Sequence, residues 1–155
     1  MRSFSLLFLR LSLGALFFYA GITKVLDPSW SAAGYLLNAK TFPALYAWFA
    51  SPELLPLTNF VNEWALLLIG LFLILGIFVR ISGIAGAVLM LLYYFPILDG
   101  VYPNPHSLLV DEHIIYVFAL LTLSAFRAGR VFGLEKWCSS LPVCARFPKL
   151  RALLG

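Results

Sequence analysis

Four apolar runs, separated by charged or turn-forming residues, most constrain how this chain of 155 residues can fold. They cover about residues 4–26, 60–79, 81–98 and 108–126. A helix needs about 20 mostly apolar residues to cross a hydrocarbon core of roughly 30 Å. The mean hydropathy is +0.94 and only 12% of the residues are charged, which is outside the range of ordinary soluble domains. The sequence therefore predicts an all-α integral membrane protein, a bundle of four transmembrane helices.

The basic residues divide unequally between the two ends of these predicted spans. Nine lie on one side, and only Lys24 and Lys40 lie on the other. The nine are Arg2, Arg10, Arg80, Arg127, Arg130, Lys136, Arg146, Lys149 and Arg151. Lysine and arginine in short flanking segments resist translocation, so both termini and the loop near Arg80 are expected in the cytoplasm. The net charge of +4 then reflects topology and contact with anionic lipids, and gives no reason to propose nucleic acid as a partner.

The segment at 27–59 is too apolar and aromatic to be a free loop. Its aromatic residues are Trp30, Tyr35, Phe42, Tyr46, Trp48 and Phe49. Asp27-Pro28 and Thr41-Phe42-Pro43 resemble helix starts, with a capping residue followed by proline in the first turn. Short helices lying in the membrane interface fit best. Two roles stay open for them: anchoring, or a lid over a cavity between the spans.

Small residues form a face on several predicted spans. At 100° per residue, Gly14 and Gly21 share one stripe with Arg10 and Lys24 on the first span. Gly70 belongs to such a face on the second span. Gly83 and Gly86 belong to a face of this kind on the third span. Small residues allow helices to approach closely in a membrane, so these glycines predict helix packing.

Ionisable residues gather at the end of the spans where Lys24 lies. They are Lys24, Glu63, Asp111, Glu112 and His113. Tyr93 and Tyr94 of the third span lie at the same end. Charged groups at this depth are costly unless they are paired or face water, which makes them candidates for ligand binding. The alternative is an ion pair from Lys24 to Glu63 or Asp111 that holds the bundle together, with Asp111 or Ser107 capping the fourth helix. In a regular helix, Asp111 and His113 point about 200° apart, so one of them is expected to point away from any shared cavity.

No metal site or resident cofactor is expected from the sequence. Cys138 and Cys144 are separated by five intervening residues, which matches no zinc-ligand spacing, and a free-thiol state is predicted. His106 and His113 do not make a convincing haem pair, and the chain has no flavin or nucleotide fingerprint. Any redox activity therefore needs a partner subunit that carries the electrons.

Short motifs in the spans resemble a known family. They are Arg10-x3-Gly14-x6-Gly21-x2-Lys24, Glu63-Trp64, Arg80-x2-Gly83 and Val110-Asp111-Glu112-His113. In this order the chain resembles the DoxX family, whose relatives include the DoxD-like small subunit of thiosulfate:quinone oxidoreductase. The resemblance covers roughly residues 5–135, so a membrane domain is expected over 1–135, followed by a basic cytoplasmic tail at 136–155.

The resemblance implies a protein of the prokaryotic cytoplasmic (inner) membrane. The leading hypothesis is a subunit of a redox system that binds quinone or a lipid-like ligand near Lys24, Glu63, Tyr93, Asp111, Glu112 and His113. The second is a non-catalytic accessory or assembly subunit, with a protein partner or a second copy of the chain beside the membrane lipids. The third is a proton-coupled carrier of a small solute. Thiosulfate is not expected as a substrate, because two lysines face six acidic residues on that side.

Overall fold

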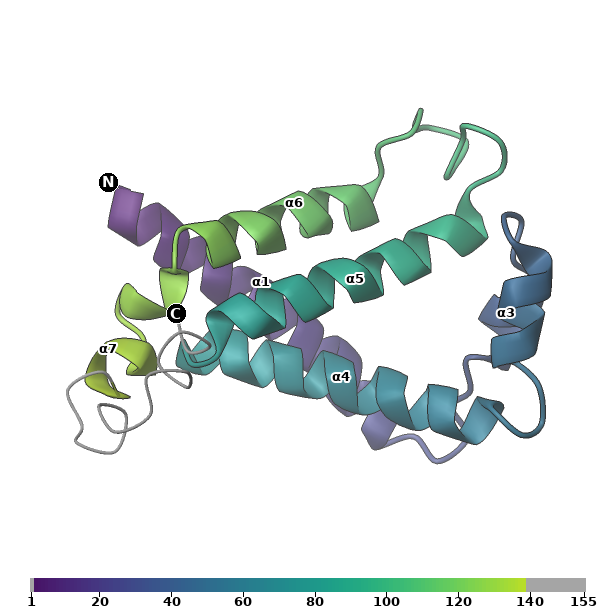
Figure 1. Ribbon diagram of the computed structural model, residues 1–155, viewed down its shortest axis with the longest axis horizontal. Helices are drawn as coiled ribbons and strands as arrows, with labels where there is room; N and C mark the ends of the chain where they lie inside the picture. Colours follow the sequence, from purple (N-terminus) through teal and green to yellow (C-terminus); the bar gives the residue numbers. More distant parts are fainter. Residues whose placement is uncertain (1, 139–155) are drawn as a thin grey trace.

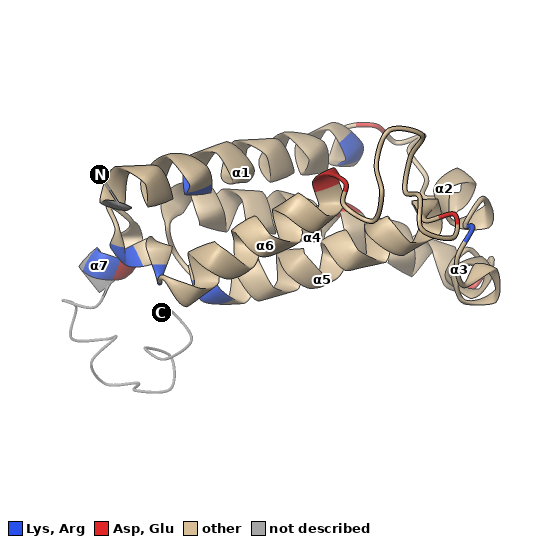
Figure 2. Cartoon of the chain, turned by 90° about the horizontal axis from the view of Figure 1, so that it is seen from above, with Lys and Arg blue, Asp and Glu red and all other residues tan. Residues whose placement is uncertain are grey.

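The computed structural model describes residues 2–138, and these residues form helices joined by turns and loops (Figure 1). The elements are α1 (Arg2–Val25), α2 (Ala33–Leu37), α3 (Pro43–Phe49), α4 (Leu55–Leu75), α5 (Val79–Ile97), α6 (Glu112–Ala125), the 3-10 turn η1 (Ala128–Arg130) and α7 (Leu134–Cys138). The four long helices lie side by side as a bundle. α2 and α3 lie at one end of the bundle, and α7 lies at the other (Figures 1 and 2).

Three helices of the described residues are long and apolar enough to cross a membrane, namely α1, α4 and α5. The fourth apolar run forms the shorter helix α6, which has 14 residues and therefore rises roughly 21 Å at 1.5 Å per residue. This is less than a hydrocarbon core of roughly 30 Å. An all-α membrane protein is thus confirmed, with three helices of spanning length and one shorter apolar helix.

Helix ends differ from the expected ends where capping and turn chemistry intervene. The run expected at 60–79 is helical from Leu55, because Pro56 suits the first turn of a helix. The same helix ends at Leu75, because Gly76 adopts a left-handed conformation with φ 66°. The run expected from residue 108 becomes helical only at Glu112, after Asp111 caps it.

The segment between α1 and α4 contains short helices, as expected, but the first begins later than expected. The Asp27 side chain accepts hydrogen bonds from the backbone and hydroxyl of Ser29, at 3.0 and 2.6 Å, and so closes a local turn. This turn competes with a helix start, and α2 begins at Ala33 instead. The second helix, α3, does begin at Pro43.

The bundle consists of two closely packed helix pairs. α1 packs mainly against α4, and α5 packs mainly against α6. In the first pair, a Cβ added to Gly70 would lie 2.2 Å from the Phe18 backbone nitrogen, and one added to Gly21 would lie 2.3 Å from that of Leu67. The backbones of α1 and α4 can therefore approach this closely only because glycine stands at both positions.

Three more glycines that the sequence singled out also lie at these contacts. In the first pair, a Cβ on Gly14 would meet Ile74 of α4 at 2.8 Å. In the second pair, a Cβ on Gly83 would meet the Ser124 hydroxyl at 2.2 Å, and one on Gly86 would meet Leu120 at 3.0 Å. All five glycines thus face the partner helix of their own pair.

The end of the bundle that carries Arg10, called here the Arg10 end, contains a buried charge. Arg10 is 1% exposed. One of its terminal nitrogens donates hydrogen bonds to the carbonyls of Ala128 at 2.7 Å and Val131 at 3.0 Å. A Cβ on Gly76 or Gly133 would come within 2.7 Å of this guanidinium. The turn after α6 thus wraps around an arginine of the first helix.

Glu135 connects α7 to the turn between α4 and α5. Its side chain is 4% exposed. Its Oε1 accepts a hydrogen bond from the Val79 backbone N–H at 2.9 Å, and its own N–H donates to the Gly76 carbonyl at 3.0 Å. Burial raises the pKa of this carboxyl, and the Val79 hydrogen bond and the charges of Arg130, Arg10 and Arg127 offset that rise only in part. Of the cysteines, Cys138 ends α7 and Cys144 lies outside the described residues.

We expect the glycine contact between α1 and α4 to be sensitive to a single methyl group. Gly70→Ala overpacks this contact and lowers the free energy of unfolding by about 1–3 kcal/mol. Gly34→Ala is the matched control, because nothing lies within 4 Å of the added Cβ and alanine favours the helix. Thermal unfolding in detergent measures both. Equal melting temperatures for the two variants would contradict the close approach.

The raised pKa of Glu135 predicts a pH-dependent stability. The folded state holds this proton more tightly than the unfolded chain, so stability decreases as pH rises from the reference value of 4.5 through the raised folded-state value. Glu135→Gln mimics the protonated side chain and does not titrate. The stability of this variant minus that of the unmodified protein should therefore increase over that pH window and stay constant below it. Thermal unfolding at a series of pH values tests this, with Asp99→Asn as a control at an exposed carboxyl. Parallel pH profiles for Glu135→Gln and the unmodified protein would disprove it.

Candidate functional site

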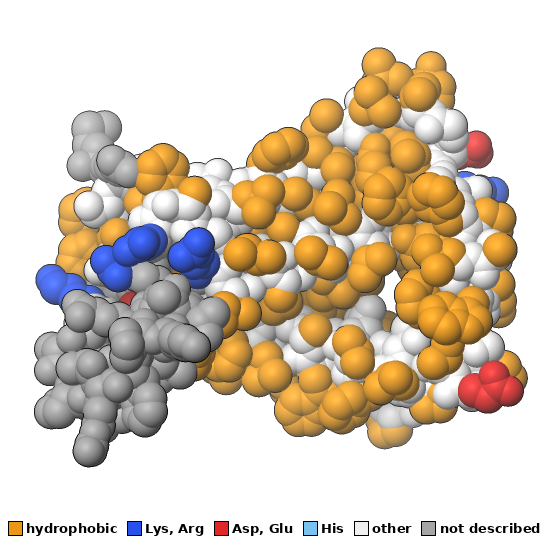
Figure 3. Space-filling model, viewed as in Figure 1, with side chains coloured by type: hydrophobic (Ala, Val, Ile, Leu, Met, Phe, Trp, Pro, Cys, Tyr) orange, Lys and Arg blue, Asp and Glu red, His pale blue; other side chains and the backbone are white. Residues whose placement is uncertain are grey.

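A cavity of about 350 Å³ lies between the short helices α2 and α3 and the adjoining parts of α4 and α5. Its lining is almost entirely apolar and aromatic. The lining residues are Ala32, Tyr35, Leu36, Tyr46, Trp48, Phe49, Leu54, Leu57, Thr58, Val61, Asn62, Leu89, Leu92 and Tyr93. The cavity lies at the end of the bundle opposite the cluster of Lys and Arg side chains in Figure 3, and hydrophobic side chains dominate the surface at the cavity's end. This end is called here the Lys24 end.

A proline inside α5 helps to attach α3 to the bundle. Pro96 has no N–H, so the carbonyl of Leu92, four residues earlier, has no intrahelical donor. The Tyr46 hydroxyl donates to that carbonyl at 3.0 Å. One turn of α5 therefore offers an acceptor to a side chain of α3, and Tyr46 itself is 2% exposed.

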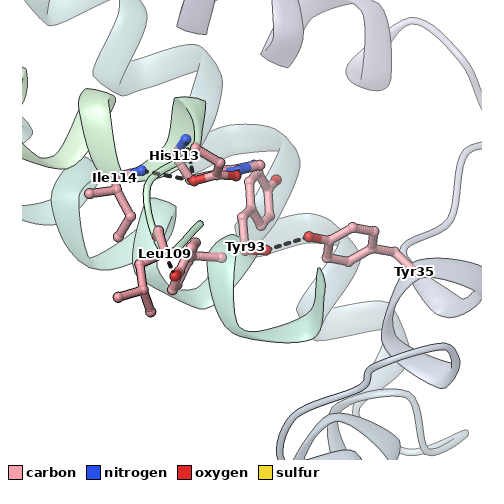
Figure 4. A network of polar contacts seen from close by, with 7 residues as sticks. Tyr35, Tyr93, Leu109, His113 and Ile114 are labelled. Carbon is pink, nitrogen blue, oxygen red and sulfur yellow. Dashed lines mark hydrogen bonds and ion pairs between the residues drawn. The ribbon is translucent and has the colours of Figure 1, made fainter. Parts of the chain in front are cut away.

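The short helices make further hydrogen bonds to the same end of α5. The Tyr35 hydroxyl donates to the Tyr93 carbonyl, as the dashed line in Figure 4 marks. The Lys40 backbone N–H donates to the Pro96 carbonyl at 2.8 Å, and the Thr41 hydroxyl donates to that of Leu98 at 2.6 Å. Burial raises the pKa of Tyr35 and of Tyr46, so both phenols are neutral donors at physiological pH.

The polar part of the cavity wall is an amide beside a phenol. The Tyr93 hydroxyl donates to Asn62 Oδ1 at 2.7 Å. Asn62 is 9% exposed, and within the described residues its Nδ2 makes no hydrogen bond. The other hydroxyls of the wall donate to backbone carbonyls, since Thr58 bonds that of Phe49 at 3.1 Å. Asn62 is thus a buried side chain of the wall that keeps donor capacity for a ligand in this cavity.

Next to Tyr93, a hydrogen bond joins an aspartate and a histidine, and the aspartate also caps α6. Asp111 Oδ1 accepts from the backbone N–H groups of His113 at 3.0 Å and Ile114 at 3.2 Å, and Asp111 Oδ2 lies 2.6 Å from His113 Nδ1. The ring of His113 meets the ring of Tyr93 edge to face, with centroids 6.1 Å apart (Figure 4). The separation of about 200° expected for a regular helix does not apply here, because Asp111 is an extended residue before the helix, with φ −125° and ψ −170°.

The other residues expected at the site lie elsewhere. Lys24 donates to the Ala20 carbonyl at 3.1 Å and its amine lies 5.3 Å from the centre of the Trp30 ring. It makes no ion pair with Glu63 or Asp111 in the described part of the chain, where Asp111 instead contacts His113. Glu112 is exposed at the start of α6. Of the predicted residues, the structure brings together Tyr93, Asp111 and His113. Tyr93 lines the cavity, whereas Lys24, Glu63, Asp111, Glu112 and His113 lie outside its wall.

Two important residues were missed by sequence reasoning. Asn62 was overlooked because the neighbouring Glu63 carries a charge, although an uncharged amide inside an apolar run is itself a signal of a polar contact. Pro96 was overlooked because it stands near the end of a run. A proline inside a helix frees the carbonyl four residues before it, and that rule identifies Leu92 as an acceptor.

These features define a class of protein: a small α-helical membrane protein with an apolar cavity beside its helix bundle. The family model DoxX matches residues 5–97. The chain therefore belongs to the DoxX family. The matched residues end with α5, so the sequence around Asp111 and His113 lies outside the match. Neither a curated protein nor a solved structure matches the chain.

The contact between Tyr46 and the Leu92 carbonyl can be tested by a double-mutant cycle. Tyr46→Phe leaves a partly buried carbonyl without a donor and is expected to cost about 1 kcal/mol. In a Pro96→Ala background the new backbone N–H can donate to Leu92, so Tyr46→Phe is expected to cost less there. Thermal unfolding measures the cycle, with Tyr19→Phe, on a 71% exposed side chain, as control. Equal costs in the two backgrounds would show that Pro96 does not create the acceptor.

Proposed function

We propose that this DoxX protein is the membrane subunit of a quinone-linked redox system and that the cavity holds the quinone head group. The observation that carries the proposal is the Asn62–Tyr93 pair in an otherwise apolar cavity. A quinone is a flat ring with two carbonyl acceptors and an apolar tail. Its carbonyl suits the amide Nδ2 of Asn62, and its ring suits a wall of Tyr35, Phe49 and Tyr93.

The size of the cavity supports a ligand of this kind. Small-molecule sites range over about 300–1,000 Å³ and combine an apolar wall with few polar groups that fix orientation. A volume of about 350 Å³ suits a quinone ring with the first part of its tail. The remaining tail would lie outside the cavity, along the helices.

The mouth of the cavity favours a ligand dissolved in the membrane over one dissolved in water. The lining residues with large exposed fractions are apolar or aromatic: Trp48 and Leu57 at 57% each, and Val61 at 52%. An aqueous solute would have to pass these side chains without a polar partner. This arrangement supports the quinone or lipid-like ligand rather than a carrier of small polar solutes.

The proposal includes four membrane crossings, with α6 as the fourth. The three residues Leu108, Leu109 and Val110 precede its cap and are 60%, 51% and 54% exposed, so they extend the apolar surface beyond the helix itself. With the Arg10 end in the cytoplasm, both termini lie inside, in agreement with the positive-inside rule. We place the protein in the inner membrane of a prokaryote, where quinones are available to it.

In this proposal the electrons come from a partner subunit. The chain contributes the binding site, since its sequence carries no nucleotide or flavin fingerprint. Tyr93 holds Asn62 by its hydroxyl, and the ring of His113 packs on Tyr93 from the other side. The hydrogen bond between His113 and Asp111 fixes that ring, so the role of this pair is to position Tyr93.

Quinone binding is tested on the purified protein by solvent extraction with mass spectrometry, and by the melting temperature with added quinone. We expect a quinone in the extract and a higher melting temperature. Asn62→Leu removes the hydrogen bond to the ligand, and affinity is expected to fall by up to about tenfold, since one hydrogen bond contributes about 0.5–1.5 kcal/mol.

Thr122→Val is the matched control, because that hydroxyl bonds only within α6, to the Phe118 carbonyl. It should bind quinone as the unmodified protein does. An extract without quinone, together with a melting temperature that quinone does not change, would refute the proposal.

A further inference from the structure

A second cavity of about 360 Å³ lies beside the first, between α2 with its following turn and the last residues of α5. It is lined by Gly34, Tyr35, Asn38, Lys40, Pro96 and Ile97. Tyr35 lines both cavities. The apolar cavity and this second cavity are therefore neighbours, separated by one phenol side chain whose hydroxyl is bound to the Tyr93 carbonyl.

The second cavity has what the first lacks, a cation. Lys40 is exposed, and its amine has no hydrogen-bond or ion-pair partner within the described residues. Its backbone is fixed against α5 by the bond to the Pro96 carbonyl. Lys24, the other lysine at this end, is occupied by the Ala20 carbonyl and the Trp30 ring. An anion at this end of the bundle would therefore find its free positive charge at Lys40.

The two cavities contact α5 at different heights. The second cavity touches Pro96 and Ile97, at the end of the helix, whereas the first touches Leu89, Leu92 and Tyr93. Leu89 and Ile97 are eight residues apart, which corresponds to roughly 12 Å along the helix axis. α5 is long enough to cross a membrane, so its end lies at the level of the lipid head groups and the first cavity lies deeper. A charged group at the level of the head groups and an apolar cavity deeper in the membrane match the charged head group and the acyl chains of a membrane lipid.

We propose that the two cavities together bind an anionic phospholipid, with its phosphate at Lys40 and one acyl chain passing Tyr35 into the apolar cavity. This proposal rests on the proposed function only in that both place a membrane-dissolved ligand in the apolar cavity. The Asn38 side chain, which donates one hydrogen bond to the Gly34 carbonyl at 2.7 Å, has a second N–H for the phosphate. A quinone has no charged group for Lys40, so Lys40 distinguishes the two ligands.

The test compares lipids with identical acyl chains and different head groups. The full-length protein in a neutral detergent is titrated with phosphatidylglycerol, with phosphatidylcholine and with inorganic phosphate, and binding is followed by native mass spectrometry and melting temperature. We expect phosphatidylglycerol to bind most tightly. Lys40→Gln should weaken it about fivefold, which corresponds to about 1 kcal/mol for a basic residue near an anionic surface.

Arg80→Gln is the matched control, because it removes one exposed positive charge at the Arg10 end. It should leave phosphatidylglycerol affinity unchanged. Equal weakening by Lys40→Gln and Arg80→Gln would mean general attraction to surface charge, and would overturn the proposal. Stabilisation by inorganic phosphate equal to that by phosphatidylglycerol would also overturn it, because the acyl chain would then contribute nothing.

A variant that fills the apolar cavity tests the path of the acyl chain. Leu92→Trp, and independently Val61→Trp, replace lining residues that are 41% and 52% exposed, so each can accept a larger side chain at the mouth. Both variants should lose phosphatidylglycerol and quinone binding while keeping helical circular dichroism. If they lose quinone but keep phosphatidylglycerol, the lipid proposal fails and the proposed function stands. If phosphatidylglycerol behaves as expected and no quinone binds, the lipid proposal stands and the quinone function fails.

Discussion

The carbonyl of Leu92 is the acceptor on which the Lys24 end of this molecule depends. Pro96 leaves it without an intrahelical partner, and a carbonyl without a donor is costly where water is scarce. Tyr46 supplies the donor and so places α3 over the side of α5. Once α3 is fixed there, Trp48 and Phe49 become the outer wall of the cavity. A missing backbone N–H thus helps to determine where the cavity forms.

At both ends of the bundle, side chains pair with backbone groups of the helices and turns, but the kind of side chain differs between the ends. At the Arg10 end, buried charges meet backbone groups: Arg10 binds the carbonyls after α6, and Glu135 binds the first N–H of α5. At the Lys24 end, neutral hydroxyls of the short helices meet carbonyls of α5. Arg10 and Glu135 therefore close the Arg10 end, whereas neutral hydroxyls attach the short helices at the Lys24 end. The cavity at the Lys24 end is lined mainly by apolar and aromatic side chains, with Asn62 as a buried donor.

Much of the bundle followed from the sequence, because periodic apolar runs and glycine faces depend on local sequence and on close helix contact. α1 and α5 began and ended within a few residues of expectation, and Gly21 and Gly70 lie where the helices meet. The site was harder to predict, because its contacts join residues far apart in the chain. Asp111 and His113 met only because the cap residue left helical geometry. Lys24 and Glu63 lie on facing helices but form no ion pair, and their positions in the sequence did not indicate this.

The contact of Glu135 with Val79 limits the order in which the contacts of the Arg10 end can form during synthesis. Val79 opens α5, and no side chain close in sequence caps that end of the helix. Its N–H group finds an acceptor 56 residues later, and Arg10 finds the Ala128 carbonyl 118 residues later. A chain emerging from the ribosome has therefore placed its first three long helices before either group has its final partner. The Arg10 end can therefore reach its final contacts only after η1 and α7 have been synthesised.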